Sequence, residues 1–89
     1  MLHPVKECIA KTGLTHNAFA VLHGISLQRL KDCLYGYTAS IPKRIISVMI
    51  QNGYDEQEAQ KQYLQWRRWK AEQELLSFSH AKLEGRRQE

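Results

Sequence analysis

Several features that would assign the chain to a particular class of protein are missing. No apolar run approaches the roughly 18 residues that a bilayer span requires, and the N-terminus lacks the apolar stretch of a secretory signal. The alternation of apolar and polar residues that marks a half-buried strand never extends over more than a few positions. We therefore expect an all-α, cytoplasmic protein with no membrane partner.

Cysteine is scarce, with only Cys8 and Cys33 in 89 residues. Both lie on apolar helical faces rather than in a C-x-x-C pair, which favours two buried thiols, although the sequence leaves a disulfide open. The four histidines do not follow a zinc-binding spacing. We expect no metal and no cofactor.

Patterns typical of an enzyme are also missing. The expected helices bring no Ser/His/Asp or Cys/His set together, and no glycine-rich loop is present that could cradle a phosphate. The carboxylates of Asp55, Glu56 and Glu58 are typical of the first turn of a helix. The sequence therefore predicts a binding protein rather than an enzyme.

What the chain does have is helical periodicity almost throughout. The first helix has the apolar face Leu2, Val5, Cys8 and Ile9, with Pro4 near its start and Gly13 at its end. A later helix begins at Pro42 and ends at Asn52-Gly53, and its apolar set is Ile45, Ile46, Val48, Met49 and Ile50. The length and composition predict one compact domain of four to five helices.

Residues 15–36, THNAFAVLHGISLQRLKDCLYG, carry the most informative pattern. Thr15 is suited to cap a helix over 16–23, with Phe19 and Leu22 on its inward face. Gly24 can adopt the left-handed conformation that ends this helix, and Ser26 can cap the next one, over 27–35. The buried side of this second helix is predicted to hold Leu30, Cys33 and Leu34.

This spacing resembles the helix-turn-helix of the lambda-repressor-like (Cro/C1, or XRE) family of DNA-binding proteins. The matching positions are Ala20, Gly24, Ile25, Ser26, Leu30, Cys33 and Gly36. The resemblance implies that the second helix enters the major groove of double-stranded DNA. It further suggests a repressor-type transcription regulator, and the Cro-like size suggests a phage or prophage origin.

The resemblance also implies which residues contact DNA. The base-reading positions are Leu27, Gln28, Arg29 and Asp32. Glutamine can pair with adenine, arginine with guanine, and leucine can pack on a thymine methyl, whereas Asp32 could instead pair with Arg29 or Lys31 along the helix. The expected phosphate contacts are His16, Ser26, Lys31, Tyr37, Thr38, Lys43 and Arg44, although the last two could equally form a solvated face.

The distribution of charge agrees with this interpretation. The net charge is +4. Residues 1–54 contain six Lys and Arg against two Asp and Glu, whereas residues 55–89 contain seven of each. The whole surplus therefore lies on the half that carries the helix-turn-helix, where it would attract a polyanion. A merely soluble basic protein remains the alternative.

The C-terminal third predicts a long helix, capped by Asp55 and continuing to about Phe78. We divide the chain into a helix-turn-helix core at 1–54, this helix at 55–79 and a polar tail at 80–89. Apolar residues on the part of this helix beyond the domain would be exposed unless another chain buried them. Repressors of the family that the sequence resembles bind paired half-sites as dimers. We therefore expect a homodimer interface formed by Trp66, Trp69, Leu75, Leu76 and Phe78.

Two alternatives stay open at this stage. Both tryptophans could belong to the core of the monomer. The chain could also be a protein-interaction module, such as an anti-repressor or adaptor, that binds another protein through the tryptophan-bearing helix. Basic outward residues on the second helix favour the DNA-binding regulator.

Overall fold

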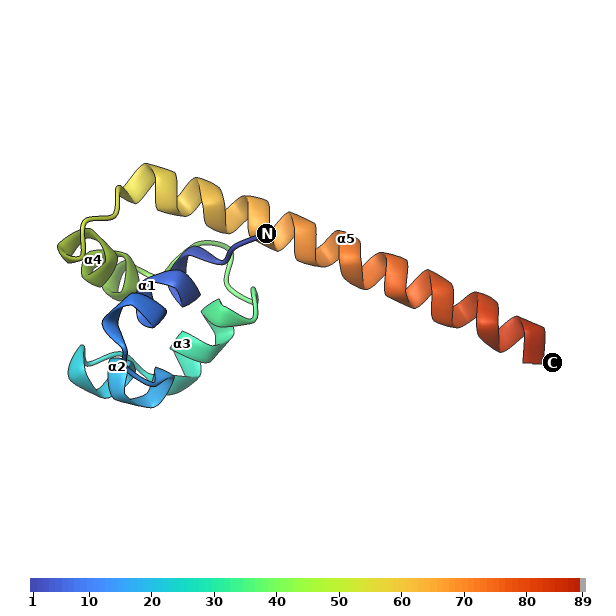
Figure 1. Cartoon of the computed structure of the whole chain (residues 1–89), viewed down its shortest axis with the longest axis horizontal. Coiled ribbons are helices and arrows are strands. Elements are labelled where there is room, and N and C mark those ends of the chain that lie inside the picture. The colour runs from blue at the N-terminus through green and yellow to red at the C-terminus, as the bar shows by residue number, and fades with distance from the viewer. Residues whose placement is uncertain (89) are drawn as a thin grey trace.

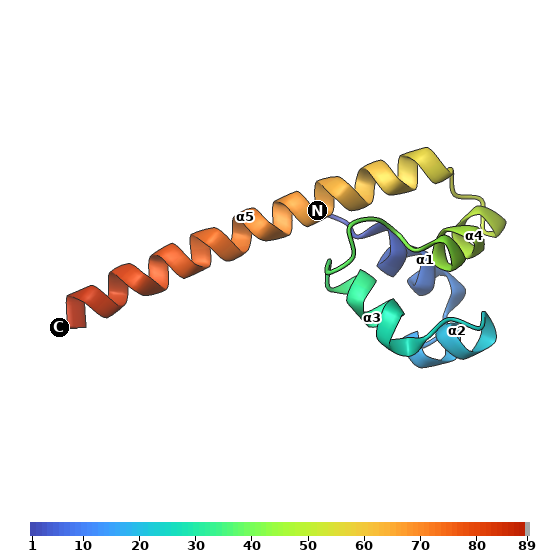
Figure 2. The same cartoon turned by 180° about the vertical axis from the view of Figure 1, so that it is seen from behind.

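A computed structural model of the chain describes the backbone of residues 1–88 and the side chains of residues 1–77. Its elements are α1 (Pro4–Thr12), α2 (His16–Leu22), α3 (Leu27–Leu34), α4 (Lys43–Gln51) and α5 (Glu56–Gln88). The expected all-α fold of four to five helices is confirmed. Helices α1 to α4 form a small globule, and α5 crosses it and runs on beyond it (Figure 1; seen from behind in Figure 2).

Helix ends follow the capping residues in the sequence. The ring of His3 caps α1 by accepting a hydrogen bond from Val5 N at 3.1 Å, and Pro4 is the first helical residue. Asp55 Oδ2 accepts from Glu58 N at 2.9 Å and so caps α5. Pro42, predicted to be the first residue of its helix, is instead the N-cap residue of α4.

The core is built from one apolar face of each helix. Its members are Val5, Cys8, Ile9, Phe19, Ala20, Ile25, Leu30, Cys33, Leu34, Ile41, Ile45, Ile46, Val48, Met49, Ala59, Tyr63 and Trp66. Helix α5 packs on α1 and α4. Both cysteines are buried free thiols, and burial raises the pKa of Cys33 to about 11.

Three residues predicted to face inward are exposed. Leu2 is 64% exposed because it precedes α1 and does not share that helix's face. Leu22 is 67% exposed because Phe19 and Ala20 set the buried side of α2, and Leu22 follows Ala20 by about half a turn. Ile50 is 45% exposed, since Met49 beside it takes the inward position.

Helix α5 is longer than predicted. Its 33 residues correspond to about 50 Å, and its backbone continues through residues 80–88, which the sequence analysis assigned to a polar tail. The molecule measures 54 × 25 × 21 Å, and the long dimension follows this helix (Figure 1). Within the described part of the chain, no helix combines the length and apolar character needed to cross a bilayer.

Candidate nucleic-acid interface

The turn between α2 and α3 has the geometry that the sequence predicted. Thr15 Oγ1 accepts from Ala18 N at 3.1 Å, which caps α2. Gly24 adopts a φ of +64°, a left-handed conformation that costs a residue with a Cβ atom about 1–2 kcal/mol. Ile25 N then donates to Ala20 O at 2.8 Å, and the Ile25 side chain fills the corner between the helices. These contacts set the crossing of α2 and α3.

The outward face of α3 is accessible at the predicted positions. Gln28, Arg29 and Lys31 are exposed, and Asp32 is half-exposed. Gln28 Nε2 donates to Asp32 Oδ1 at 2.9 Å, one helical turn away. The partner of Asp32 is therefore Gln28 rather than Arg29 or Lys31. The Gln28 amide nitrogen carries two N–H groups, so one can stay with Asp32 while the other faces a base edge.

Leu27 differs from the other base-reading candidates. Its side chain is half-buried and packs against the core at the start of α3. Together with Leu14 and Ile9 it lines a hollow between the N-terminal ends of α2 and α3 and helix α1. Only the solvent-facing part of Leu27 could contact a thymine methyl, so its main role is packing.

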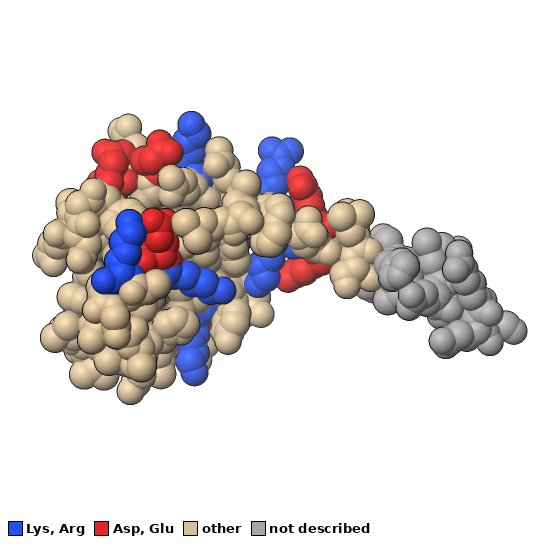
Figure 3. Space-filling model, viewed as in Figure 1, with Lys and Arg blue, Asp and Glu red and all other residues tan. Residues whose placement is uncertain are grey.

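A second hollow lies between the start of α3 and the start of α4. It has a volume of about 760 Å³, and its three charged residues, Arg29, Lys43 and Arg44, are all basic. Ser26 and Ser40 add hydroxyl groups to its lining. Figure 3 shows acidic side chains gathered over the beginning of α5 at the top of the view, and a basic side chain at the lower edge of the globule. Basic and hydroxyl groups together are suited to phosphate.

Arg44 also has a structural role in this hollow. Its Nη1 donates to Gly24 O at 2.6 Å, which ties the first turn of α4 to the turn between α2 and α3. No side chain caps the N-terminus of α4. Its first backbone N–H groups therefore lie next to Lys43 and Arg44, and they can add to the attraction for an anion.

The remaining phosphate candidates fall into two groups. His16, Ser26 and Tyr37 are exposed, and Ser26 Oγ also caps α3 by accepting from Arg29 N at 3.4 Å. Thr38 lines the basic hollow, but its hydroxyl already has a partner. Its half-buried hydroxyl lies 2.8 Å from the hydroxyl of Tyr63, which also donates to Thr38 O at 2.8 Å. Thr38 therefore fixes the loop against α5 and is not free for a phosphate.

The predicted dimer interface divides between core and surface. Trp66 is 6% exposed and packs against the ring of His3, with 4.3 Å between ring centroids, so it is core and its assignment to a dimer interface is wrong. Trp69 is 37% exposed, and Leu75 and Leu76 are each 63% exposed. The side chain of Phe78 lies outside the described residues.

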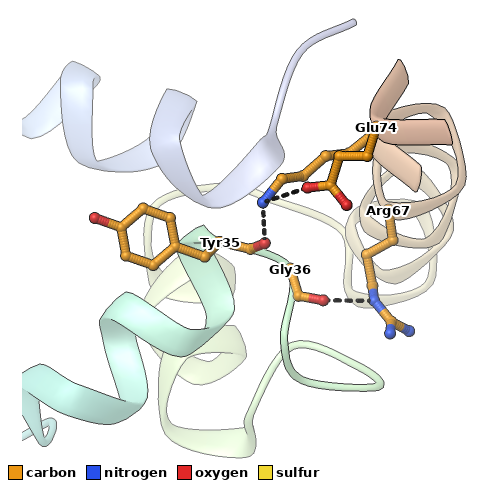
Figure 4. Close-up of polar contacts among 5 residues, drawn as sticks. Tyr35, Gly36, Arg67 and Glu74 are labelled. Carbon is orange, nitrogen blue, oxygen red and sulfur yellow. Dashed lines mark hydrogen bonds and ion pairs between the residues drawn. The ribbon is translucent and has the colours of Figure 1, made fainter. Parts of the chain in front are cut away.

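A set of contacts between α5 and the loop after α3 was missing from the sequence predictions. The amide of Gln60 accepts from Ile41 N at 2.9 Å and donates to Ile41 O at 3.0 Å. Arg67 Nε donates to Gly36 O at 2.9 Å, and Lys70 Nζ donates to Tyr35 O (Figure 4). These polar residues share one face of α5 with Tyr63, at spacings of three and four, and this spacing is the signal that could have identified them.

Comparisons with protein-family models, with curated proteins and with solved structures find no match to this chain. Among the residues whose side chains are described, no three His, Cys, Asp or Glu gather as a metal site. The site combines a capped two-helix corner, an exposed polar face on α3 and a basic hollow beside it.

Proposed function

We propose that this chain is a sequence-specific regulator that binds double-stranded DNA through a helix-turn-helix of the lambda-repressor-like type. The observation that carries the proposal is the position of Arg29, Lys43 and Arg44 on one hollow beside the exposed face of α3. A helix that enters the major groove needs exposed polar side chains toward the bases and cations toward the flanking phosphates. Helix α3 and the start of α4 supply these two requirements on adjacent surfaces.

In this proposal the residues have separate roles. Gln28 and Arg29 read base edges, with Asp32 orienting Gln28 through its hydrogen bond. Lys43, Arg44 and the uncapped N-terminus of α4 bind the phosphates beside the groove. His16 and Lys31 contact the backbone on the other side, where both line the hollow next to Leu27. The protein binds rather than catalyses.

Selection from a pool of randomised duplexes, followed by gel shifts of the selected sequence over a range of salt, tests the proposal. We expect binding that survives competitor DNA and falls steeply with salt. Gln28→Ala combined with Arg29→Ala should reduce the preference for the selected sequence more than the affinity for random DNA. The control Gln65→Ala alters an exposed glutamine of α5 and should leave both unchanged. Failure to enrich any sequence would contradict the proposal.

The part of α5 beyond the globule supports a homodimer as a second element of the proposal. Leu75 and Leu76 are exposed on adjacent sides of this helix, with Trp69 two turns before Leu76. A second copy would cover this apolar surface and would place two reading helices on paired half-sites. The dimer is then part of DNA recognition rather than a separate activity.

The same exposed residues favour a second candidate function, a module that binds another protein through α5. In that case the leucines would be covered by a partner of different sequence, as an anti-repressor or adaptor requires. A monomeric chain that enriches no duplex would support this candidate. A dimer that binds a selected duplex would exclude it as the main function.

A further inference from the structure

A third hollow lies between α5 and the loop that follows α3. Tyr35 and Tyr37 border it from the loop, with exposed fractions of 52% and 73% and ring centroids 5.8 Å apart. Lys70 Nζ lies 5.8 Å from the ring centroid of Tyr35 and 5.5 Å from that of Tyr37. The ammonium group thus makes cation–π contacts with both rings, and it also donates to Tyr35 O (Figure 4).

The charge of this hollow is positive. Arg67, Arg68 and Lys70 line it together with one acid, Glu74. Lys70 Nζ lies 3.8 Å from Glu74 Oε1, so Lys70 partly neutralises the negative charge of Glu74. The side chain of Arg68 is 86% exposed, and its only described ion pair is a 3.7 Å contact with Glu72, one helical turn away. Solvated pairs of this kind contribute little, so Arg68 remains available to an anion.

The hollow continues the surface that α3 presents to DNA. Tyr35 follows Gln28 by seven residues, which corresponds to two helical turns and about 10 Å along the same side of the helix. The major groove is about 12 Å wide. When Gln28 lies over the bases, the strand that borders the groove therefore passes near the C-terminal end of α3, where this hollow lies.

We infer that the hollow formed by Tyr35, Tyr37, Arg67 and Arg68 binds the phosphate backbone of the DNA strand that borders the groove read by α3. This inference rests on the proposed function and extends the interface from the helix-turn-helix to α5. The tyrosine hydroxyls donate hydrogen bonds to phosphate oxygens, and Arg68 supplies the charge. Lys70 and Arg67 position the loop through the carbonyls of Tyr35 and Gly36.

The salt dependence of binding to the selected duplex tests the role of Arg68. Arg68→Gln should reduce the slope of log affinity against log salt by about 1, as expected for one lost phosphate contact. Lys61→Gln is the matched control. It removes one charge from an exposed residue of the same helix, two turns earlier and outside the hollow, and should leave the slope unchanged. Arg68 makes no contact that holds the fold, so both variants should keep the thermal stability of the wild type.

The tyrosines are tested by the double variant Tyr35→Phe with Tyr37→Phe, which retains both rings and removes only the hydroxyls. We expect a loss of affinity of several fold with no change in the preferred sequence, because phosphate contacts carry no base information. If the wild type binds a selected duplex but Arg68→Gln and Lys61→Gln show equal salt slopes, this inference alone is overturned. A wild type that enriches no duplex would overturn the proposed function and this inference together, and would favour an acidic protein partner.

Discussion

At the scale of single residues, Gly36 determines how closely α5 approaches the end of α3. It has a φ of +82°, and a Cβ atom at this position would lie 2.8 Å from Cζ3 of Trp66. Trp66 is buried against His3 and cannot move aside without opening the core. Both the backbone conformation and the contact therefore require glycine here.

Gly36→Ala should reduce the free energy of unfolding by about 2–5 kcal/mol, the sum of the left-handed penalty and the overpacking against Trp66. Gly53→Ala separates the two contributions. Gly53 has a φ of +90° but nothing within 4 Å of a Cβ atom, so its substitution should cost only the left-handed penalty of about 1–2 kcal/mol. Urea denaturation of both variants measures the difference. Equal losses would mean that Trp66 does not pack as closely as described.

In the part of the chain with described side chains, His3 is the only buried histidine. Its ring donates from Nε2 to Cys33 O at 3.1 Å and accepts from Val5 N at Nδ1, which requires the neutral form. Burial lowers the pKa of His3 from 6.5 to about 4, with smaller contributions from Lys6 and Lys70, while its hydrogen bonds oppose the shift.

This lowered pKa predicts a specific dependence of stability on pH. Since the unfolded chain binds a proton at His3 below pH 6.5 and the folded chain only below about pH 4, stability should fall as the pH decreases between these values. The total loss is about 3 kcal/mol. Denaturation curves at several pH values test this against His3→Asn, which keeps a capping side chain but cannot titrate. Parallel curves for the two proteins would contradict it.

At the scale of helices and loops, α5 holds the segment between α3 and α4 along most of its length. Gln60, Tyr63, Arg67 and Lys70 contact successive carbonyls of this segment, from Ile41 back to Tyr35. The loop that borders both basic hollows therefore takes its shape from α5. Removing one of these hydrogen bonds should lower the free energy of unfolding more than the solvent exposure of the α5 side chain suggests.

Gln60→Glu tests this role of α5. The amide of Gln60 both accepts from and donates to Ile41, whereas a carboxylate would lose the donor and face the Ile41 carbonyl oxygen. We expect a loss of about 1–3 kcal/mol in the free energy of unfolding. Gln65→Glu makes the same substitution at an exposed position of the same helix and should be nearly neutral. A comparable loss in both variants would indicate a general effect of charge.

Local features of the fold could be predicted from the sequence. Thr15, Ser26 and Asp55 cap the helices as expected, because a side-chain oxygen at such a position satisfies backbone N–H groups that the helix leaves free. Gly24 adopts the expected left-handed conformation. The exposure of Gln28 and Arg29 also followed from the helical period of their apolar neighbours.

Features that depend on tertiary contacts could not be predicted in this way. The burial of Trp66 depends on His3, 63 positions earlier, and the hydroxyl of Thr38 is engaged because Tyr63 lies across from it. Similarly, Leu22 has the residue type and spacing of a core position, but α2 is too short to bury more than the side around Phe19 and Ala20. Periodicity identifies an apolar side, whereas the neighbouring elements decide which of its residues are covered.

At the scale of the whole molecule, α5 projects from one side of the globule (Figure 1). The projecting part carries the exposed Leu75 and Leu76. Because α5 is fixed to the loop after α3, a partner bound to the projection would have a defined position relative to α3. In a dimer this coupling would set the spacing between half-sites.

Sedimentation velocity measures the predicted dimer. The wild type should sediment as a dimer, and Leu75→Asp with Leu76→Asp should be monomeric because charged groups would replace the covered apolar surface. Leu22→Asp introduces one such charge at a similarly exposed leucine on α2 and should leave the dimer intact. A monomeric wild type would contradict the dimer without affecting the fold.

The central claim is that the outward face of α3 and the basic hollow beside it bind DNA. Titration of the isotope-labelled protein with its selected duplex, followed by amide chemical shifts, tests it most directly. The account predicts that the largest changes fall on residues 26–32 and 42–44, with smaller changes at Tyr35 and Tyr37. Changes confined to α5, or no changes at any duplex concentration, would contradict the claim.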